Sequence, residues 1–127
     1  MCIRDSMEGV RSVRDVLGLI IAECHVFPTA WGHEAPAGAA SGFGAELQRA
    51  GALQRSEIIS ELGSAFDHLI GVVRGMDNTE RMADSNYFGR PMTITANIVI
   101  SMGDMHEHLG QLIAYARTNE VVPPWSR

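Results

Sequence analysis

The segment TITANIVISMGDMHEHLGQLIAYARTN, residues 93–119, decides the fold. Its apolar residues recur at intervals of three and four, the spacing of one face of an α-helix. This pattern predicts one long helix from near Thr93 to Asn119. The two prolines that follow, before Trp125, cannot continue a helix and predict a short stiff tail. The apolar face of the predicted helix comprises Ile94, Ile98, Met102, Met105, Leu109, Leu112, Ile113 and Ala116.

Two earlier segments have the same periodicity. The first opens at Ser12 with Asp15 three residues later, which is a helix-start signal, and it extends to about Pro28. The second runs from near Ser56 to about Arg74 and ends before a glycine. The first apolar face comprises Val13, Val16, Leu17, Ile20, Ile21, Cys24 and Phe27, and the second comprises Ile58, Ile59, Leu62, Ala65, Phe66, Leu69, Ile70 and Val73.

These three helices define the expected fold class. No segment alternates convincingly enough to predict a strand, so the chain is expected to be all-α, an antiparallel helical bundle. Residues 32–52 are rich in Gly, Ala and Pro and are predicted to form a long mobile loop. Apolar faces this wide usually require a fourth helix. We therefore expect a bundle that lacks its first helix, and a homodimer in which a second copy covers the exposed groove.

Composition and charge limit the function classes. With 127 residues the chain makes one domain, expected over 7–127, while residues 1–6 look like a non-native leader. A net charge of −5 argues against nucleic-acid binding, and the absence of lysine excludes Schiff-base and Walker-type sites. Two cysteines make no disulfide framework. Without a signal peptide or a membrane-spanning run of apolar residues, a cytoplasmic protein without membrane partners is expected.

The motif GDMHEHLGQ, residues 103–111, is the sharpest chemical feature. Asp104 and His108 are spaced i, i+4 and stack on one edge of the predicted apolar face, while His106 points to the opposite edge. A carboxylate and an imidazole one turn apart can reach a single divalent ion. They can equally form a hydrogen-bonded pair at the edge of a bundle. Glu107 points further outward and is assigned no catalytic role.

The remaining histidines and the cysteine of the first helix have simpler interpretations. His25 lies at the border of the first apolar face and is interpreted as a half-buried residue with one satisfied nitrogen, more readily than as a metal ligand. His33 and His68 are expected at the surface. Cys24 lies on the core face and is interpreted as a buried, unactivated thiol.

Three stretches together resemble the DinB-like family, also called the DinB/YfiT superfamily. They are VRSVRDVLG at residues 10–18, NIVISMGDMHEHLGQLIAYARTNEVVPPW at residues 97–125, and the loop-and-helix spacing between them. The resemblance implies a four-helix bundle whose first helix precedes the R-S-V motif. It also implies a divalent ion, often zinc or nickel, held by three histidines. Characterised members include thiol-dependent S-transferases and isomerases that use bacillithiol or mycothiol.

The resemblance places the last histidine of the family motif at His108. The family histidine four residues earlier falls on Asp104, and aspartate is also able to bind a divalent ion. The first family histidine, however, falls on Leu19, which cannot bind a metal. His25 lies six residues beyond Leu19, some 120° away around the helix, and is therefore a weak substitute. The sequence does not identify the third metal ligand.

Two functions are compatible with these residues. The first is a divalent-metal-dependent transferase or hydrolase, acting on a small-molecule substrate through a metal that lowers the pKa of a water or thiol. The second is a metal-free helical bundle that has lost its chemistry and acts as a binding or dimerisation module. The retained pair Asp104 and His108 favours the first function, and Leu19 favours the second.

Overall fold

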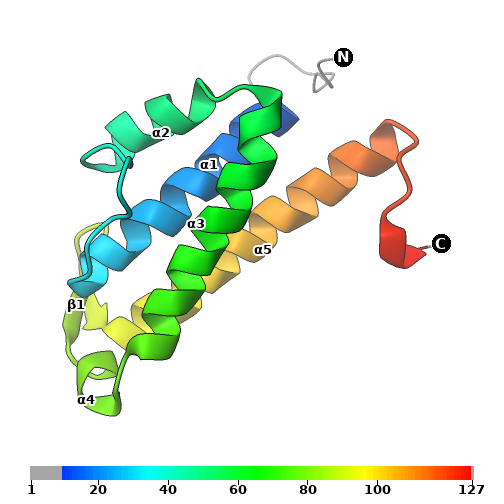
Figure 1. Cartoon of the computed structure of the whole chain (residues 1–127). Coiled ribbons are helices and arrows are strands. Elements are labelled where there is room, and N and C mark those ends of the chain that lie inside the picture. The colour runs from blue at the N-terminus through cyan, green and yellow to red at the C-terminus, as the bar shows by residue number, and fades with distance from the viewer. Residues whose placement is uncertain (1–9, 127) are drawn as a thin grey trace.

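A computed structural model describes residues 10–126, so the predicted leader at residues 1–6 lies outside the described residues. The three predicted helices are present: α1 (Val13–Val26), α3 (Arg55–Gly75) and α5 (Ile94–Thr118) (Figure 1). The smaller elements are the 3-10 helix η1 (Phe27–Trp31), α2 (Phe43–Gly51), α4 (Asn78–Arg81), the strands β1 (Asp84–Tyr87) and β2 (Arg90–Thr93), and the 3-10 helix η2 (Pro124–Ser126). The helical class is thus confirmed.

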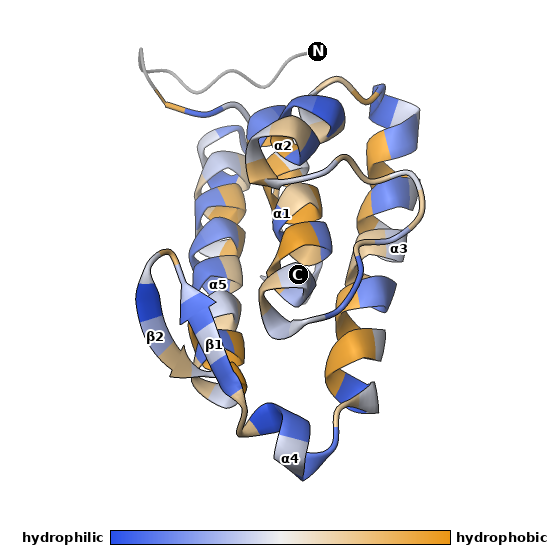
Figure 2. Cartoon of the chain, turned by 90° about the vertical axis from the view of Figure 1, so that its left-hand side faces the viewer, coloured by the Kyte–Doolittle hydropathy of each residue, from blue (hydrophilic) through white to orange (hydrophobic). Residues whose placement is uncertain are grey.

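Helix α1 is the central element. It begins as predicted, because the Ser12 side chain accepts a hydrogen bond from the Asp15 amide and the Asp15 carboxylate accepts one from the Ser12 amide. Every residue from Gly18 to His25 is buried, on all sides of the helix. Figure 2 shows why: α5 and α3 flank α1 on opposite sides, and α2 lies across a third.

The directions of the helices differ from the uniformly antiparallel arrangement expected. Arg14 near the start of α1 donates to the carbonyl of Leu53, just before α3, and His25 near the end of α1 faces His68 in the second half of α3. Helices α1 and α3 therefore run parallel, whereas α5 runs antiparallel to both (Figure 1). The cause is the segment between α1 and α3, which carries the chain back to the end of the molecule where it began.

That segment also corrects the loop predicted over residues 32–52. Its second half forms α2, which packs against α1 where the backbone of Ala50 and Gly51 approaches Gly18. A Cβ atom at position 18 would lie 3.3 Å from the Ala50 carbonyl carbon, so glycine permits this close contact. Short length and small residues concealed the helix, because its stability comes from this packing and not from its own periodicity.

The structure also contains a β-hairpin, which the sequence analysis did not predict. Strands β1 and β2 pair antiparallel, with Ser85 opposite Met92. The turn uses Phe88 and Gly89 at φ 47° and 85°, and the side chain of Asn86 accepts a hydrogen bond from the Gly89 amide. Four-residue strands are too short for alternation to show, and the hairpin leads directly into Thr93, whose hydroxyl caps α5.

The hydrophobic core lies around α1, between α3 and α5. It joins fully buried Val16, Ile21 and Cys24 to Leu69 of α3 and Met105 of α5, which confirms the core position of Cys24. Two residues of the apolar face predicted for α5, Met102 and Leu109, are exposed instead of buried, and so is Val99. In the part of the chain that the structure describes, helices are too short or too polar to cross a lipid bilayer.

Candidate metal centre

Three side chains from two helices converge between α1 and α5. Glu23 comes from α1, and Asp104 and His108 come from successive turns of α5. The cap at Thr93 and the antiparallel packing of α5 along α1 set the register that places them opposite one another. One ligand atom from each lies within 4.8 Å of the other two. The structure thus brings the predicted pair Asp104 and His108 together with a third residue.

The distances within this cluster suit a shared ion. Nε2 of His108 lies 3.1 Å from Oε1 of Glu23 and 3.8 Å from Oδ1 of Asp104. Two ligand atoms that each lie about 2 Å from a tetrahedral ion are themselves about 3.3 Å apart. The two measured distances fall on either side of this value. Small side-chain rotations would therefore suffice to place all three atoms around one ion.

Burial makes Glu23 the unusual member of the cluster. The residue is 4% exposed, and its Oε2 atom is buried without a hydrogen-bond partner among residues 10–126. Burial raises the pKa of Glu23 to about 7, against the opposing attraction of His108 and with a further increase from the nearby Asp104. A buried carboxylate with an unpaired oxygen is costly unless a cation or proton satisfies it.

Glu23 was not predicted as a ligand, because the family resemblance places a histidine at Leu19 and His25 was the substitute considered. Leu19 is 4% exposed and occupies the core side of α1. Glu23 follows four residues later and therefore lies one turn further along the same face of the helix. The signal that could have found it is an acidic residue at i+4 from an expected ligand position, flanked in the sequence by apolar residues.

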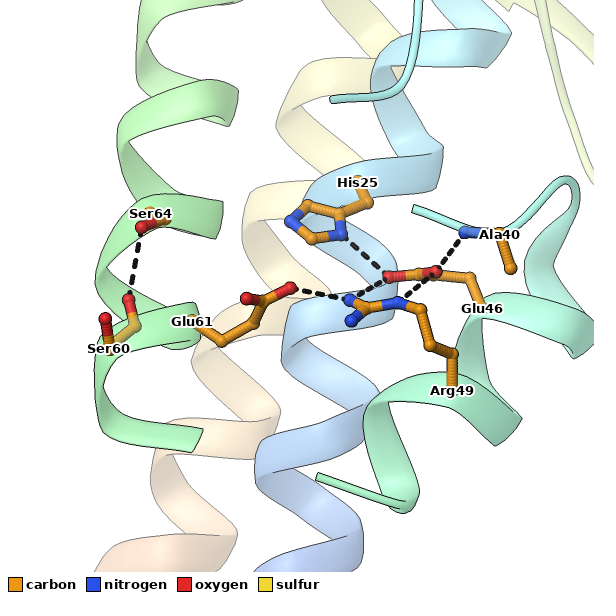
Figure 3. A network of polar contacts seen from close by, with 7 residues as sticks. All are labelled: His25, Ala40, Glu46, Arg49, Ser60, Glu61 and Ser64. Atoms are coloured by element: carbon orange, nitrogen blue, oxygen red, sulfur yellow. Dashed lines mark hydrogen bonds and ion pairs between the residues drawn. The ribbon is translucent and has the colours of Figure 1, made fainter. Parts of the chain in front are cut away.

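His25 lies on another side of α1 and has a different partner. Its Nδ1 atom is 2.7 Å from Oε1 of Glu46, a carboxylate with no exposed surface (Figure 3). Arg49 and the amide of Ala40 also donate to Glu46, and Arg49 reaches Glu61 of α3 at 2.7 Å. As predicted, one ring nitrogen of His25 has a hydrogen-bond partner. The residue is buried, however, and not half-buried as predicted. His25 therefore does not supply the third ligand beside Asp104 and His108.

The remaining polar residues of the motif and the loop lie outside the cluster. His106 is exposed and its Nδ1 lies 2.8 Å from the Met102 carbonyl, and Glu107 is exposed as expected. His33 and His68 do not have the free surface positions predicted for them. Nε2 of His33 lies 2.6 Å from Glu80. His68 is partly buried, and its ring meets that of His25 of α1.

The donor set determines which ions the cluster can accept. One imidazole and two carboxylates are ligands found for zinc and for other divalent first-row metals. Together the two carboxylates would balance the charge of one divalent ion. Compared with three histidines, this set shifts the preference toward harder ions. No family model matches the chain, and comparisons with curated proteins and with solved structures find no match either.

Proposed function

We propose that this chain is a divalent-metal-binding protein of the DinB-like type, with its metal centre at Glu23, Asp104 and His108. The observation that carries the proposal is the buried carboxylate of Glu23, which is held against His108 and leaves Oε2 unpaired among the described residues. A purely structural pair would satisfy both carboxylate oxygens or expose them to water. A cation at this place would neutralise the carboxylates and provide the missing partner.

The chemistry that we propose for this centre is transfer or hydrolysis on a small-molecule substrate, with thiol S-transfer as one form. A divalent ion supplies a Lewis acid that lowers the pKa of a water or thiol beside it. The residues of this chain have distinct tasks: Glu23 and His108 hold the inner side of the site, where water is largely excluded. Asp104 is half-buried and holds the outer side, where a substrate can approach.

Metal analysis of purified protein, together with melting temperatures measured with and without zinc or nickel, tests the proposal. A ligand present at a hundred times its Kd stabilises the folded state by about 2.7 kcal/mol. Glu23→Gln keeps the shape of the side chain but removes its charge, and His108→Ala removes the imidazole. Each should bind one ion fewer than the unmodified chain. His106→Ala, an exposed histidine of the same helix, is the matched control and should bind the full number.

The second function, a dimerisation module, is favoured by a separate observation. Val99, Met102 and Leu109 of α5 are 65%, 47% and 46% exposed, and they follow one another at helical spacing along one face. An apolar stripe of this kind is typical of a helix that meets a partner. We propose that a second copy of the chain covers it, giving a homodimer. This role is compatible with a metal centre, since His108 lies on the buried side of α5, against Glu23 of α1.

A further inference from the structure

A second cluster of imidazoles lies on the side of α1 that faces α3, away from the candidate metal centre. The rings of His25 and His68 meet edge to face, with 6.2 Å between their centres and an interplanar angle of 84°. His68 also lines an open groove of about 450 Å³, together with His33, Asp67, Gly71, Val72 and Gly75. Glycines at positions 71 and 75 have open space where a side chain would stand, which keeps this groove hollow.

Both imidazoles have a nitrogen without a partner in residues 10–126. Nε2 of His68 is buried and makes no hydrogen bond. His25, which is 4% exposed, uses Nδ1 for Glu46, and Figure 3 shows its second ring nitrogen turned toward α3. Burial, together with the proximity of His25 and His33, lowers the pKa of His68. A neutral imidazole at this position can offer a lone pair to a cation.

Glu46 determines which ring nitrogen of His25 carries the proton. Burial alone would raise the pKa of Glu46, but hydrogen bonds from Arg49, Ala40 and His25 lower it to about 2, so that the carboxylate is ionised and can only accept. Nδ1 of His25 must therefore be the donor, which leaves the lone pair of the neutral ring on Nε2. Carboxylate–histidine pairs orient metal-binding imidazoles in this way, because they fix both the tautomer and the ring.

From this arrangement we infer that His25 and His68 form a second site for a borderline divalent transition metal such as zinc, nickel or copper. Two imidazoles that bind one ion have ring centres about 5 to 6 Å apart, given metal–nitrogen distances of about 2 Å. The observed 6.2 Å is close to this range. The remaining coordination positions face the groove, where water can fill them, since among the described residues the cluster of three ligand atoms within 4.8 Å is the one at Glu23. The ion would join α1 to α3, whereas the proposed centre at Glu23 joins α1 to α5.

Zinc titration of the full chain, read as the number of ions bound, tests this inference separately from the proposed function. The unmodified chain and the control His106→Ala should bind two ions. His68→Ala and His108→Ala should each bind one, and the double variant none. A chain that binds one ion, lost in His68→Ala but kept in His108→Ala, would support this site and contradict the proposed function. Two ions bound to folded His68→Ala would overturn the inference.

Nitrogen-15 spectra of the unmodified chain give a second measurement that does not depend on a variant folding. Zinc should shift the Nε2 resonances of both His25 and His68, and leave that of His106 unchanged. Unshifted resonances of His25 and His68 at saturating zinc would also overturn the inference. Glu46→Gln should weaken this site by about 10- to 100-fold and leave the site at His108 intact, as expected for loss of an orienting carboxylate.

Discussion

The carboxylate of Glu46, on α2, lies 2.7 Å from Nδ1 of His25, on α1, and neither side chain has appreciable exposed surface. This contact attaches the returning segment of the chain to the central helix. Arg49 completes the charge balance of Glu46 and continues the network to Glu61 of α3. One buried acid thus connects three helices, and we expect the stability of the protein to depend on its ionisation.

Acid should destabilise the protein through Glu46. Its pKa is about 2 in the folded protein, below the ordinary glutamate value of 4.5, so the folded state binds the proton less tightly than the unfolded state. The resulting stabilisation is present above pH 4.5 and is lost as the pH falls toward 2. Urea denaturation of Glu46→Gln should show a loss of about 3 kcal/mol at neutral pH, as for a broken buried pair. The difference from the unmodified chain should shrink through the pH 4.5–2 window. A constant difference would contradict this assignment.

The contact between α1 and α2 should make Gly18 intolerant of a side chain. Alanine normally stabilises a helix relative to glycine by about 1 kcal/mol. At position 18, however, the added methyl group would meet the backbone of Ala50 and Gly51 at 3.3 Å, and backbone cannot rotate away. We expect Gly18→Ala to reduce the free energy of unfolding by about 1 kcal/mol. The matched control is Gly63→Ala in α3, where the space is open and stability should rise. Equal gains in both variants would show that α2 does not pack closely here.

Replacement of Leu19 by histidine should strengthen the metal centre. Leu19 precedes Glu23 by one turn, so an imidazole there would add a donor to the same face of α1. Without metal, Leu19→His should lose about 2 kcal/mol of stability, since it places a polar ring in the core. Zinc should restore this loss and raise the melting temperature above that of the metal-loaded unmodified chain. The additional stabilisation should vanish when Leu19→His is combined with His108→Ala; its survival would place the new ligand at another site.

The exposed stripe on α5 should mediate association. Sedimentation at tens of micromolar is expected to show a dimer, because burial of Val99, Met102 and Leu109 removes apolar surface from water. The double change Val99→Ser and Met102→Ser should shift the protein to monomer while leaving its helical content unchanged. Ile59 of α3 is 74% exposed and lies outside this stripe, so Ile59→Ser serves as the control and should remain dimeric. A monomeric unmodified chain would contradict the predicted interface.

The sequence by itself determined the three long helices and one pair of the candidate site. Each helix has at least 14 residues, so its apolar periodicity is long enough to read. Local signals such as Ser12 with Asp15 mark where one begins. Asp104 and His108 belong to one helix, and their proximity follows from the helical repeat alone. The core position of Cys24 follows from the same periodicity.

Tertiary structure alone decided the remaining features. Helix α2 depends on the close approach to Gly18, and the β-hairpin depends on a two-residue turn beside α5; neither is long enough to leave a periodic pattern. The parallel course of α1 and α3 follows from the path of the segment between them. Glu23 joins Asp104 and His108, and His68 meets His25, only because helices distant in sequence pack in one particular register. Periodicity shows which face of a helix is buried, but the residue it meets is set by the packing of the whole chain.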